Sequence, residues 1–356
     1  MRALIAMSGG VDSSVAAKQI KEAGYECIGC TMKLYENEDL GISSGKTCCS
    51  LDDIADARAV CAKLGMPYYV FNFTENFREK VIDKFVRCYQ EGITPNPCID
   101  CNRYLKWDQL YNRMKELDCD YLVTGHYARV EKTENGYILK KAKNLAKDQT
   151  YVLYNLTQEE LAHLLLPCGE LEDKEETRTL AREGGFRNSE KPDSQDICFV
   201  PDVDYASVVE RYSGKKSVPG NFIDTEGHVI AEHKGIIHYT IGQRKGLGLS
   251  FTEPHYVTKI DPVANTVTLG LSADLFSTDA DANDMNWISG IVPDHPVRCK
   301  AKIRYRHAEQ WATVIPTGEK TVHVTFDEPQ RAITPGQSLV LYDGDICLGG
   351  GVLIRS

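Results

Sequence analysis

No stretch of the 356-residue sequence approaches the roughly 20 consecutive apolar residues that a membrane-spanning helix needs. The first residues read as a strand followed by a glycine-rich turn, so we expect no cleavable signal peptide at this end. These absences predict a cytoplasmic protein with no membrane partner.

The sequence also lacks an excess of positive charge. Its 41 Lys and Arg against 51 Asp and Glu give a net charge of −10, which argues against a generic nucleic-acid coat. Local basic patches on an acidic protein can still bind RNA. The chain has no low-complexity segment and no clear internal repeat, and its composition is ordinary for a globular protein.

Cysteine, in contrast, is abundant for a cytoplasmic chain, with 13 residues. In that compartment cysteines are more often reduced, catalytic or metal-binding than joined in structural disulfides. The thiols are therefore candidates for catalysis or metal binding.

A glycine-rich segment, Ser8–Ser13, follows the first apolar run, Ala3–Met7. It leads into an amphipathic helix that is expected to end near Gly24. The Gly-Lys-Ser/Thr ending of a Walker loop is absent. Glycine backbone N–H groups, a helix N-terminus and serine hydroxyls still make this segment a predicted phosphate cradle.

Strand and helix patterns alternate through the first part of the chain and predict a doubly wound parallel α/β sheet. The sequence pattern changes near residue 200, where short β-rich runs begin. It changes again near 275, where the expected strands become evenly spaced and are separated by Gly and Pro turns. We predict three domains: a catalytic domain over 1–200, a small β-rich linker domain over 201–275, and an antiparallel β-barrel over 276–356.

Two cysteine segments are set apart from the others. The first, residues 92–102, contains Cys98 and Cys101 in a proline-stiffened loop that is expected to present its thiols. The second, residues 194–199, contains Cys198, whose thiolate could attack or carry a second sulfur as a persulfide. Most remaining cysteines lie in strand or helix patterns and are interpreted as core residues; the role of Cys48 and Cys49 stays open.

With these motifs in view, the chain resembles the bacterial tRNA-specific 2-thiouridylases, which belong to the N-type ATP pyrophosphatase superfamily. The resemblance extends over almost the whole sequence. It is carried by Met7–Ser14, Thr31–Lys33, Thr94–Asn102, Thr124–Arg129, Lys147–Gln149, Ser194–Phe199, Tyr239–Leu249 and Pro335–Gln337.

The resemblance implies ATP-dependent conversion of a wobble uridine of tRNA to 2-thiouridine. Cys101 matches the family's nucleophile, and Cys198 matches the cysteine that carries sulfur as a persulfide. Many members have Asp after Asn-Pro, where this chain has Cys98, so an acid–base role at that position is not expected. Asp100 is close in sequence and is not assigned that role.

This substitution leaves a second sulfur chemistry open. Cys98, Cys101 and Cys198 are candidate ligands of a four-iron four-sulfur cluster whose open iron would bind hydrosulfide. We prefer the route through a Cys198 persulfide and a Cys101–Cys198 disulfide.

The resemblance also implies which residues contact the substrates. ATP, with magnesium held in part by Asp12, is expected at Ala6, Met7, Ser8, Gly9, Gly10, Val11, Asp12, Ser13, Met32 and Gly125. The target base and the tRNA are expected at Asn96, Pro97, Cys98, His126, Lys147, Asp148, Gln149, Arg304, Tyr305 and Gln337.

Basic residues suggest further RNA contacts. Lys140, Lys141, Lys143 and Lys147 form one basic stretch. Lys302, Arg304 and Arg306 alternate along a strand expected over 297–305, which would place them on one face. A merely solvated surface is the alternative interpretation for both patches.

Two other functions share parts of this pattern. A small-molecule ligase or amidotransferase could use the same ATP loop, but no glutaminase segment is recognisable. A non-catalytic iron–sulfur protein would not need that loop. The immediate sulfur donor, either a cysteine desulfurase or a sulfur-relay protein, is not encoded in any motif that we identify.

Overall fold

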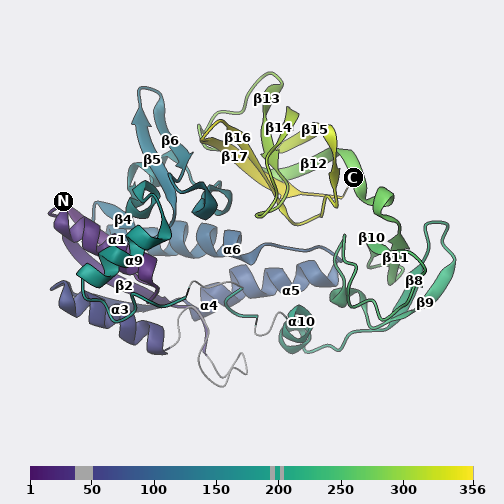
Figure 1. The fold of residues 1–356 in the computed structure, drawn as a ribbon, viewed down its shortest axis with the longest axis horizontal. Helices are drawn as coiled ribbons and strands as arrows, with labels where there is room; N and C mark the ends of the chain where they lie inside the picture. Colours follow the sequence, from purple (N-terminus) through teal and green to yellow (C-terminus); the bar gives the residue numbers. More distant parts are fainter. Residues whose placement is uncertain (37–50, 193–196, 201–203, 356) are drawn as a thin grey trace.

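The computed structural model describes residues 1–36, 51–192, 197–200 and 204–355 (Figure 1). Its first layer is a parallel sheet of five strands in the order β3-β2-β1-β4-β7. The strands are β1 (Arg2–Ala6), β2 (Glu26–Lys33), β3 (Tyr68–Asn72), β4 (Tyr121–Val123) and β7 (Leu164–Leu165). No helix in these described ranges is long and apolar enough to cross a membrane.

Both faces of this sheet are covered, because successive side chains of a strand point to opposite faces. Ala3 and Ile5 of β1 pack in one core, with helices α1 (Val11–Glu22), α3 (Leu51–Lys63) and α9 (Lys174–Glu183). Leu4, between them, packs in the core of the opposite face. Helices on that face are α4 (Thr74–Phe77), η1 (Arg78–Ile82), α5 (Asp83–Gln90), α6 (Pro97–Asp100), η2 (Cys101–Leu110) and α7 (Tyr111–Glu116).

The strand order reverses between β1 and β4, and this point positions the site. β1 pairs with β2 on one side and with β4 on the other, all parallel. In open α/β sheets a ligand binds outside the carboxyl ends of the strands at such a switch point. The glycine-rich segment follows β1 there, and residues 124–126 follow β4.

The middle region forms a separate four-stranded sheet in the order β10-β11-β8-β9. Its elements are α10 (Tyr205–Ser213), β8 (Gly220–Ile223), β9 (Val229–His233), η7 (Ile236–His238), β10 (Tyr256–Asp261) and β11 (Thr266–Gly270). Tyr205 of α10 stacks on Tyr89 of α5, with ring centroids 5.9 Å apart. The core of this region is continuous with the α5 face of the first domain.

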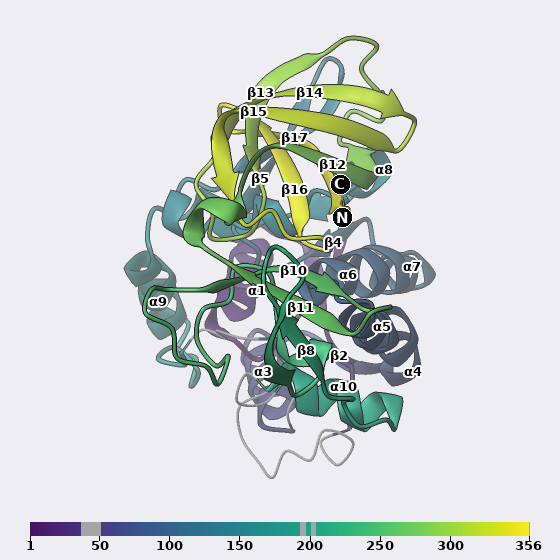
Figure 2. The ribbon, with the colours of Figure 1, turned by 90° about the vertical axis from the view of Figure 1, so that its right-hand side faces the viewer.

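The C-terminal strands close into an antiparallel barrel, because β12 pairs with both β15 and β17 (Figure 2). The strands are β12 (Phe276–Trp287), β13 (Val297–Lys302), β14 (Gln310–Gly318), β15 (Thr321–Arg331), β16 (Ser338–Asp343) and β17 (Ile346–Leu353), with η8 (Ser272–Leu275) before them. The predicted fold class, a doubly wound sheet followed by a β-rich region and an antiparallel barrel, is confirmed.

One feature was not expected from the sequence. The hairpin of β5 (Ala128–Thr133) and β6 (Gly136–Lys141) leaves the first domain and extends the barrel sheet through the β6–β17 pairing. The connection back to β7 contains η3 (Leu145–Lys147), η4 (Thr150–Val152) and α8 (Gln158–Ala162), and η5 (Pro167–Glu170) follows β7. The barrel is therefore bound to the catalytic domain by backbone hydrogen bonds.

The expected strand over 297–305 is too long. β13 ends at Lys302, Arg304 lies in a bend, and Arg306 lies in a turn. The prediction that Lys302, Arg304 and Arg306 share one strand face is therefore wrong, because the chain turns after Ile303.

Candidate functional site

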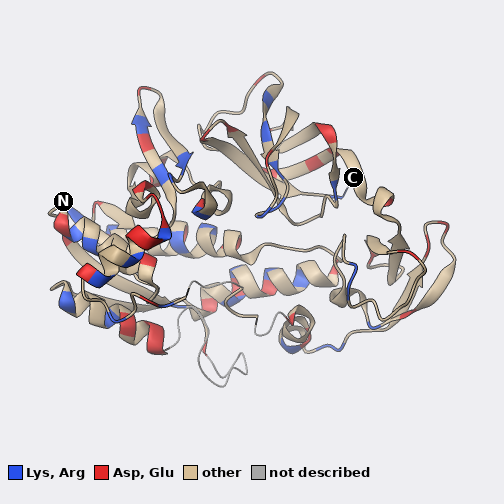
Figure 3. Ribbon diagram, viewed as in Figure 1, with Lys and Arg blue, Asp and Glu red and all other residues tan. Residues whose placement is uncertain are grey.

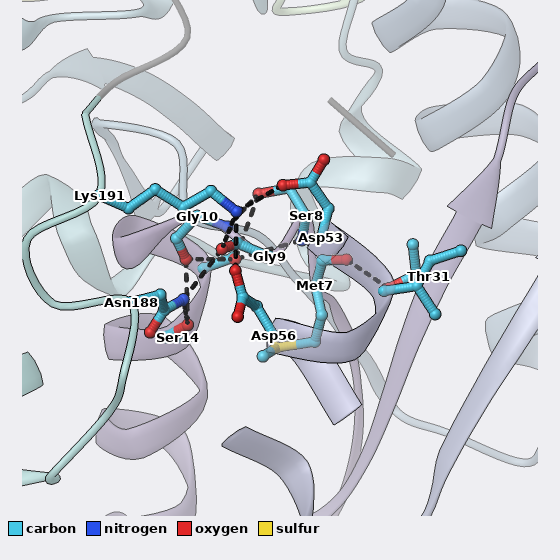
Figure 4. Close-up of polar contacts among 12 residues, drawn as sticks. Met7, Ser8, Gly9, Gly10, Ser14, Thr31, Asp53, Asp56, Asn188 and Lys191 are labelled. Atoms are coloured by element: carbon cyan, nitrogen blue, oxygen red, sulfur yellow. Dashed lines mark hydrogen bonds and ion pairs between the residues drawn. The ribbon is translucent and has the colours of Figure 1, made fainter. Parts of the chain in front are cut away.

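The segment between β1 and α1 is a tight loop stabilised by its own side chains (Figure 4). Gly9 has φ +74°, and a Cβ built on it would lie 2.4 Å from the carbonyl oxygen of Asp53, so only glycine fits. The Ser13 hydroxyl accepts a 3.2 Å bond from the Ser8 N–H and donates a 3.0 Å bond to the carbonyl of Gly10. The loop thus ends at the N-terminus of α1, whose partial positive charge suits a phosphate.

A second layer of polar residues supports this loop, and motif analysis missed it. The Asn188 amide donates to the carbonyl of Gly9 at 2.9 Å and to the Ser14 hydroxyl at 3.0 Å. Lys191 Nζ lies 2.6 Å from an Asp53 oxygen and 2.8 Å from an Asp56 oxygen (Figure 4). These residues are far from the loop in sequence and carry no motif, so no signal in a single sequence could have identified them.

Asp12, in the first turn of α1, has two polar partners. Its carboxylate accepts a 2.8 Å hydrogen bond from the Tyr127 hydroxyl and pairs with Lys174 Nζ at 2.7 Å. The backbone N–H of Tyr127 in turn donates to the Gln149 side chain at 2.9 Å. Asp12 therefore connects the loop after β1 with the segment around Gln149.

The loop after β4 packs directly against the start of α1. A Cβ built on Gly125 would lie 2.7 Å from the backbone nitrogen of Ser13, so glycine is required for this close approach. Met32 lies near the end of β2, partly buried against the core on the α5 face. The expected nucleotide positions thus lie at the carboxyl ends of three adjacent strands.

His126 follows Gly125 and is buried, so its ring is not presented to the surface. Its Nδ1 is 2.7 Å from the Thr124 hydroxyl, and its Nε2 is 3.3 Å from Lys106 Nζ of helix η2. Burial, with the Lys106 charge beside it, holds the pKa of His126 well below the usual 6.5. The imidazole is therefore neutral at physiological pH.

The Asn-Pro segment caps a long helix. The Asn96 side chain accepts from the Cys98 N–H at 3.2 Å, and Pro97 occupies the first helical position. The loop expected over 92–102 is therefore wrong after Asn96, because Cys98 lies in α6 and Cys101 begins η2. Both thiols lie at the N-terminal end of this helix; Cys98 is exposed and Cys101 is half-buried. A helix N-terminus favours the thiolate form of a cysteine.

Asp100 lies between these thiols in sequence but is directed elsewhere. It is buried, and its carboxylate pairs with Lys84 Nζ of α5 at 2.7 Å. Burial raises the pKa of Asp100, and Lys84 opposes that rise. The pair joins two helices, in agreement with leaving Asp100 without an acid–base role.

Cys198 lies in the short described segment 197–200, whereas Ser194–Asp196 of its motif lie outside the described residues, as do Cys48 and Cys49. The Tyr35 hydroxyl donates to the carbonyl of Cys198 at 3.2 Å. Phe199 packs edge-on against Phe85 at 5.2 Å, which anchors the half-buried Cys198 above α5.

Tyr305 brings the barrel close to the Asn-Pro thiols. Its hydroxyl lies 3.5 Å from the carbonyl of Asp148. Burial raises the pKa of Tyr305, and the nearby charges of Asp148 and Cys98 add to the rise. Three expected tRNA positions, far apart in sequence, therefore lie near one another.

Other expected tRNA positions have protein partners. The Asp148 carboxylate accepts from the Thr150 hydroxyl at 2.6 Å and from the Ala142 N–H at 3.1 Å, so it caps its own loop. Arg304 is half-buried and donates to the carbonyl of Arg331 at 3.1 Å. Lys147 ends η3 and is half-buried.

The predicted basic stretch is largely neutralised. Lys140 pairs with Glu131 at 3.1 Å, and Lys141 pairs with Glu309 at 2.6 Å. Lys143 lies between Glu170 and Glu172. The β5–β6 hairpin consequently shows blue and red segments side by side (Figure 3).

A cavity of about 350 Å³ lies behind the Asn-Pro loop, on its barrel side. Its lining includes Asn96, Asp100, Arg103, Asp284 and Asn155. Both polar atoms of the buried Asn155 amide have no hydrogen-bond partner within the described structure. The loop is therefore bordered by a cavity that contains these unpartnered polar atoms as well as by packed side chains.

Comparisons with known proteins give the chain its family. Residues 1–202 match the model described as tRNA methyl transferase HUP domain, 206–271 the tRNA methyl transferase PRC-barrel domain, and 277–353 the aminomethyltransferase beta-barrel domain. The tRNA-specific 2-thiouridylase MnmA of Clostridioides difficile is 52% identical over 100% of this chain and 98% of its own length. The proteins of the same name from Lachnoclostridium phytofermentans and Clostridium kluyveri are 48% and 49% identical, each over 99% of both chains. The chain belongs to the tRNA-specific 2-thiouridylase family.

Proposed function

We propose that this protein is an ATP-dependent tRNA-uridine 2-sulfurtransferase that acts on the wobble uridine. The observation that carries the proposal is the 52% identity, over the whole chain, to a protein named tRNA-specific 2-thiouridylase. The phosphate-type loop and two accessible thiols are the groups that such a reaction needs.

In the first step, the C2 oxygen of uridine attacks the α-phosphorus of ATP. An O–P bond forms, and the bond to pyrophosphate breaks with its electron pair; the N3 proton passes to solvent. The loop Met7–Ser13 and the N-terminus of α1 hold the phosphates. Adenylation converts the poor C2–O leaving group into AMP.

In the second step, sulfur reaches C2 from a Cys198 persulfide, either directly or as hydrosulfide. In the direct route the terminal sulfur attacks C2 and AMP leaves; the Cys101 thiolate then attacks the Cys198 sulfur, which breaks the S–S bond and leaves the terminal sulfur on C2. In the hydrosulfide route the Cys101 thiolate attacks the Cys198 sulfur, hydrosulfide leaves, and it then displaces AMP from C2. A Cys101–Cys198 disulfide remains, and a two-electron thiol reductant must reopen it. The persulfide sulfur is supplied by a cysteine desulfurase or a relay protein.

The sequence suggests two metal groups, an iron–sulfur cluster and magnesium, which the residues present fit differently. Among the described residues, Cys98, Cys101 and Cys198 do not gather into a metal-holding group, so the iron–sulfur route is not supported. Lys174 and Tyr127 both contact Oδ1 of Asp12, so its other carboxylate oxygen is the one that would hold magnesium. No step is assigned to either group.

The test is to incubate the purified protein with ATP, unmodified tRNA and a persulfide-generating cysteine desulfurase, and to analyse the tRNA nucleosides by mass spectrometry. We expect 2-thiouridine at the wobble position, with pyrophosphate release that depends on tRNA. Pyrophosphate release from ATP that depends on a small-molecule acceptor and not on tRNA would instead favour a ligase.

A further inference from the structure

Lys106 of η2 contacts the loop after β4 through the side chain of His126. Its Nζ lies 3.3 Å from His126 Nε2, and His126 directly follows Gly125, which packs on the start of α1. No ion pair joins Lys106 to a carboxylate in the described parts of the chain. Within these described residues, no neighbouring acid therefore neutralises its charge.

The direction of the hydrogen bonds follows from elementary chemistry. An ammonium group only donates, so His126 Nε2 accepts and the ring proton resides on Nδ1. Nδ1 then donates to the Thr124 hydroxyl at 2.7 Å. The buried neutral ring uses one of the three ammonium N–H groups and leaves two for a ligand.

Lys106 also shares a helix with the candidate nucleophile. The segment η2 is a π-helix over Cys101–Leu110. Hydrogen bonds in a π-helix join residues five apart, so Cys101 and Lys106 lie one turn apart on the same side of it. Such segments are found frequently at functional sites.

We propose that Lys106 is a catalytic residue that binds a non-bridging α-phosphate oxygen of ATP, and that His126 is the positioning residue that directs it there. This inference rests on the proposed function and assigns His126 to a different role from tRNA contact. The ammonium group stabilises negative charge while pyrophosphate leaves and again while AMP leaves. Two observations support this position: Lys106 contacts His126, whose neighbour Gly125 packs on the start of α1, and Lys106 shares η2 with Cys101.

The first test compares Lys106→Gln with Lys115→Gln, a control on the adjoining α7, where Lys115 is exposed and pairs with Glu159. We expect Lys106→Gln to lower kcat for tRNA-dependent pyrophosphate release by about 10²-fold. This is the usual effect of removing one hydrogen-bond donor to a charge that develops in the transition state. Lys106→Arg should restore part of the rate. The melting temperature and persulfide loading of Cys198 should stay unchanged in all three.

The second test uses the two diastereomers of ATP with sulfur at the α-phosphorus. One diastereomer should slow the wild-type protein more than the other does. Lys106→Gln should lose this preference between diastereomers, and a purely structural role of Lys106 would not produce such a loss. His126→Gln retains an acceptor near Nε2 and should keep more activity than His126→Leu.

The results distinguish failure of the proposed function from failure of this inference. Wild-type protein that forms no 2-thiouridine overturns the proposed function and this inference together. Wild-type protein that does form it, with Lys106→Gln equal to wild type in rate and diastereomer preference, overturns the inference alone.

Discussion

The Gln337 side-chain amide donates a 2.9 Å hydrogen bond to the carbonyl of Thr94, which lies 243 residues earlier in the chain. The Thr94 N–H donates in turn to the carbonyl of Pro335 at 3.0 Å. Between them, a Cβ on Gly336 would lie 2.3 Å from Ile93. The barrel therefore holds the Asn-Pro loop by a close two-way contact.

We predict that Gln337→Ala lowers the rate of 2-thiouridine formation by 10-fold or more while the KM for ATP stays unchanged. Small displacements of a reacting group cost about 10²-fold, and the helix that this loop leads into carries Cys98 and Cys101. Single-turnover thiolation measures the effect. Gln310→Ala, in the same barrel but away from the loop, is the control; equal rates for the two variants would contradict the prediction.

A glycine substitution tests the loop after β1. Gly24→Ala meets no atom within 4 Å and is strained only by its φ of +87°, so it should cost about 1 kcal/mol of unfolding free energy. Gly9→Ala has similar strain and also collides with Asp53, so it should cost more and weaken ATP binding. Urea unfolding and ATP titration measure both. Equal stability and ATP affinity in the two variants would argue against a preformed phosphate loop.

The sequence predicted those features that depend on local chemistry. The loop Ser8–Ser13 is encoded in contiguous residues, so its turn and the start of the following helix could be predicted. The loop expected over 92–102 was wrong in its second half, because Asn96 caps a helix that begins at Pro97. The β5–β6 hairpin was missed because its partner strand β17 lies some 200 residues away. Asn188 and Lys191 were missed because only the fold brings them to Gly9.

Site predictions met the same limit. His126 and Asp148 lie where the motif places them in sequence, yet burial turns both toward protein partners. Charge alone suggested that Lys140, Lys141 and Lys143 bind RNA, but each has a carboxylate partner contributed largely by other segments. Tertiary contacts, which one sequence does not reveal, decide whether a lysine is available.

The two sulfur-handling thiols should be separable from nucleotide chemistry. We predict that Cys101→Ser and Cys198→Ser each abolish 2-thiouridine formation and leave ATP binding intact, because neither residue lies in the loop after β1. Cys88→Ser, a half-buried thiol in α5, is the matched control and should retain activity. Nucleoside mass analysis reports the product, and wild-type levels from either test variant would exclude the persulfide mechanism.

The buried His126 should make stability depend on pH. The pKa of His126 in the folded protein lies well below 6.5. Its contribution to the free energy of unfolding is therefore complete above pH 6.5. This contribution is lost as the pH falls toward the folded pKa, because only the unfolded chain then gains the proton. The slope reaches about 1.4 kcal/mol per pH unit. His126→Gln should flatten the stability curve between pH 6.5 and 5.5 in urea unfolding; parallel curves would show that the ring is not buried as a neutral group.

The last prediction concerns tRNA binding by the barrel. Arg306 is exposed in the turn after β13, whereas Arg298 at the start of that strand forms a bidentate pair with Asp327, with one contact at 2.7 Å. If Arg306 contacts a tRNA phosphate, Arg306→Gln should weaken binding and reduce the logarithmic salt slope by about 0.7 to 0.9.

Arg298→Gln removes the same charge but should leave that slope unchanged, because its guanidinium is already paired. Neither variant should alter ATP affinity, since the phosphate loop lies in another domain. Filter-binding titrations at several salt concentrations compare the three proteins. Superimposable curves for wild type and Arg306→Gln would mean that this turn is merely solvated and that Arg306 does not contact a tRNA phosphate.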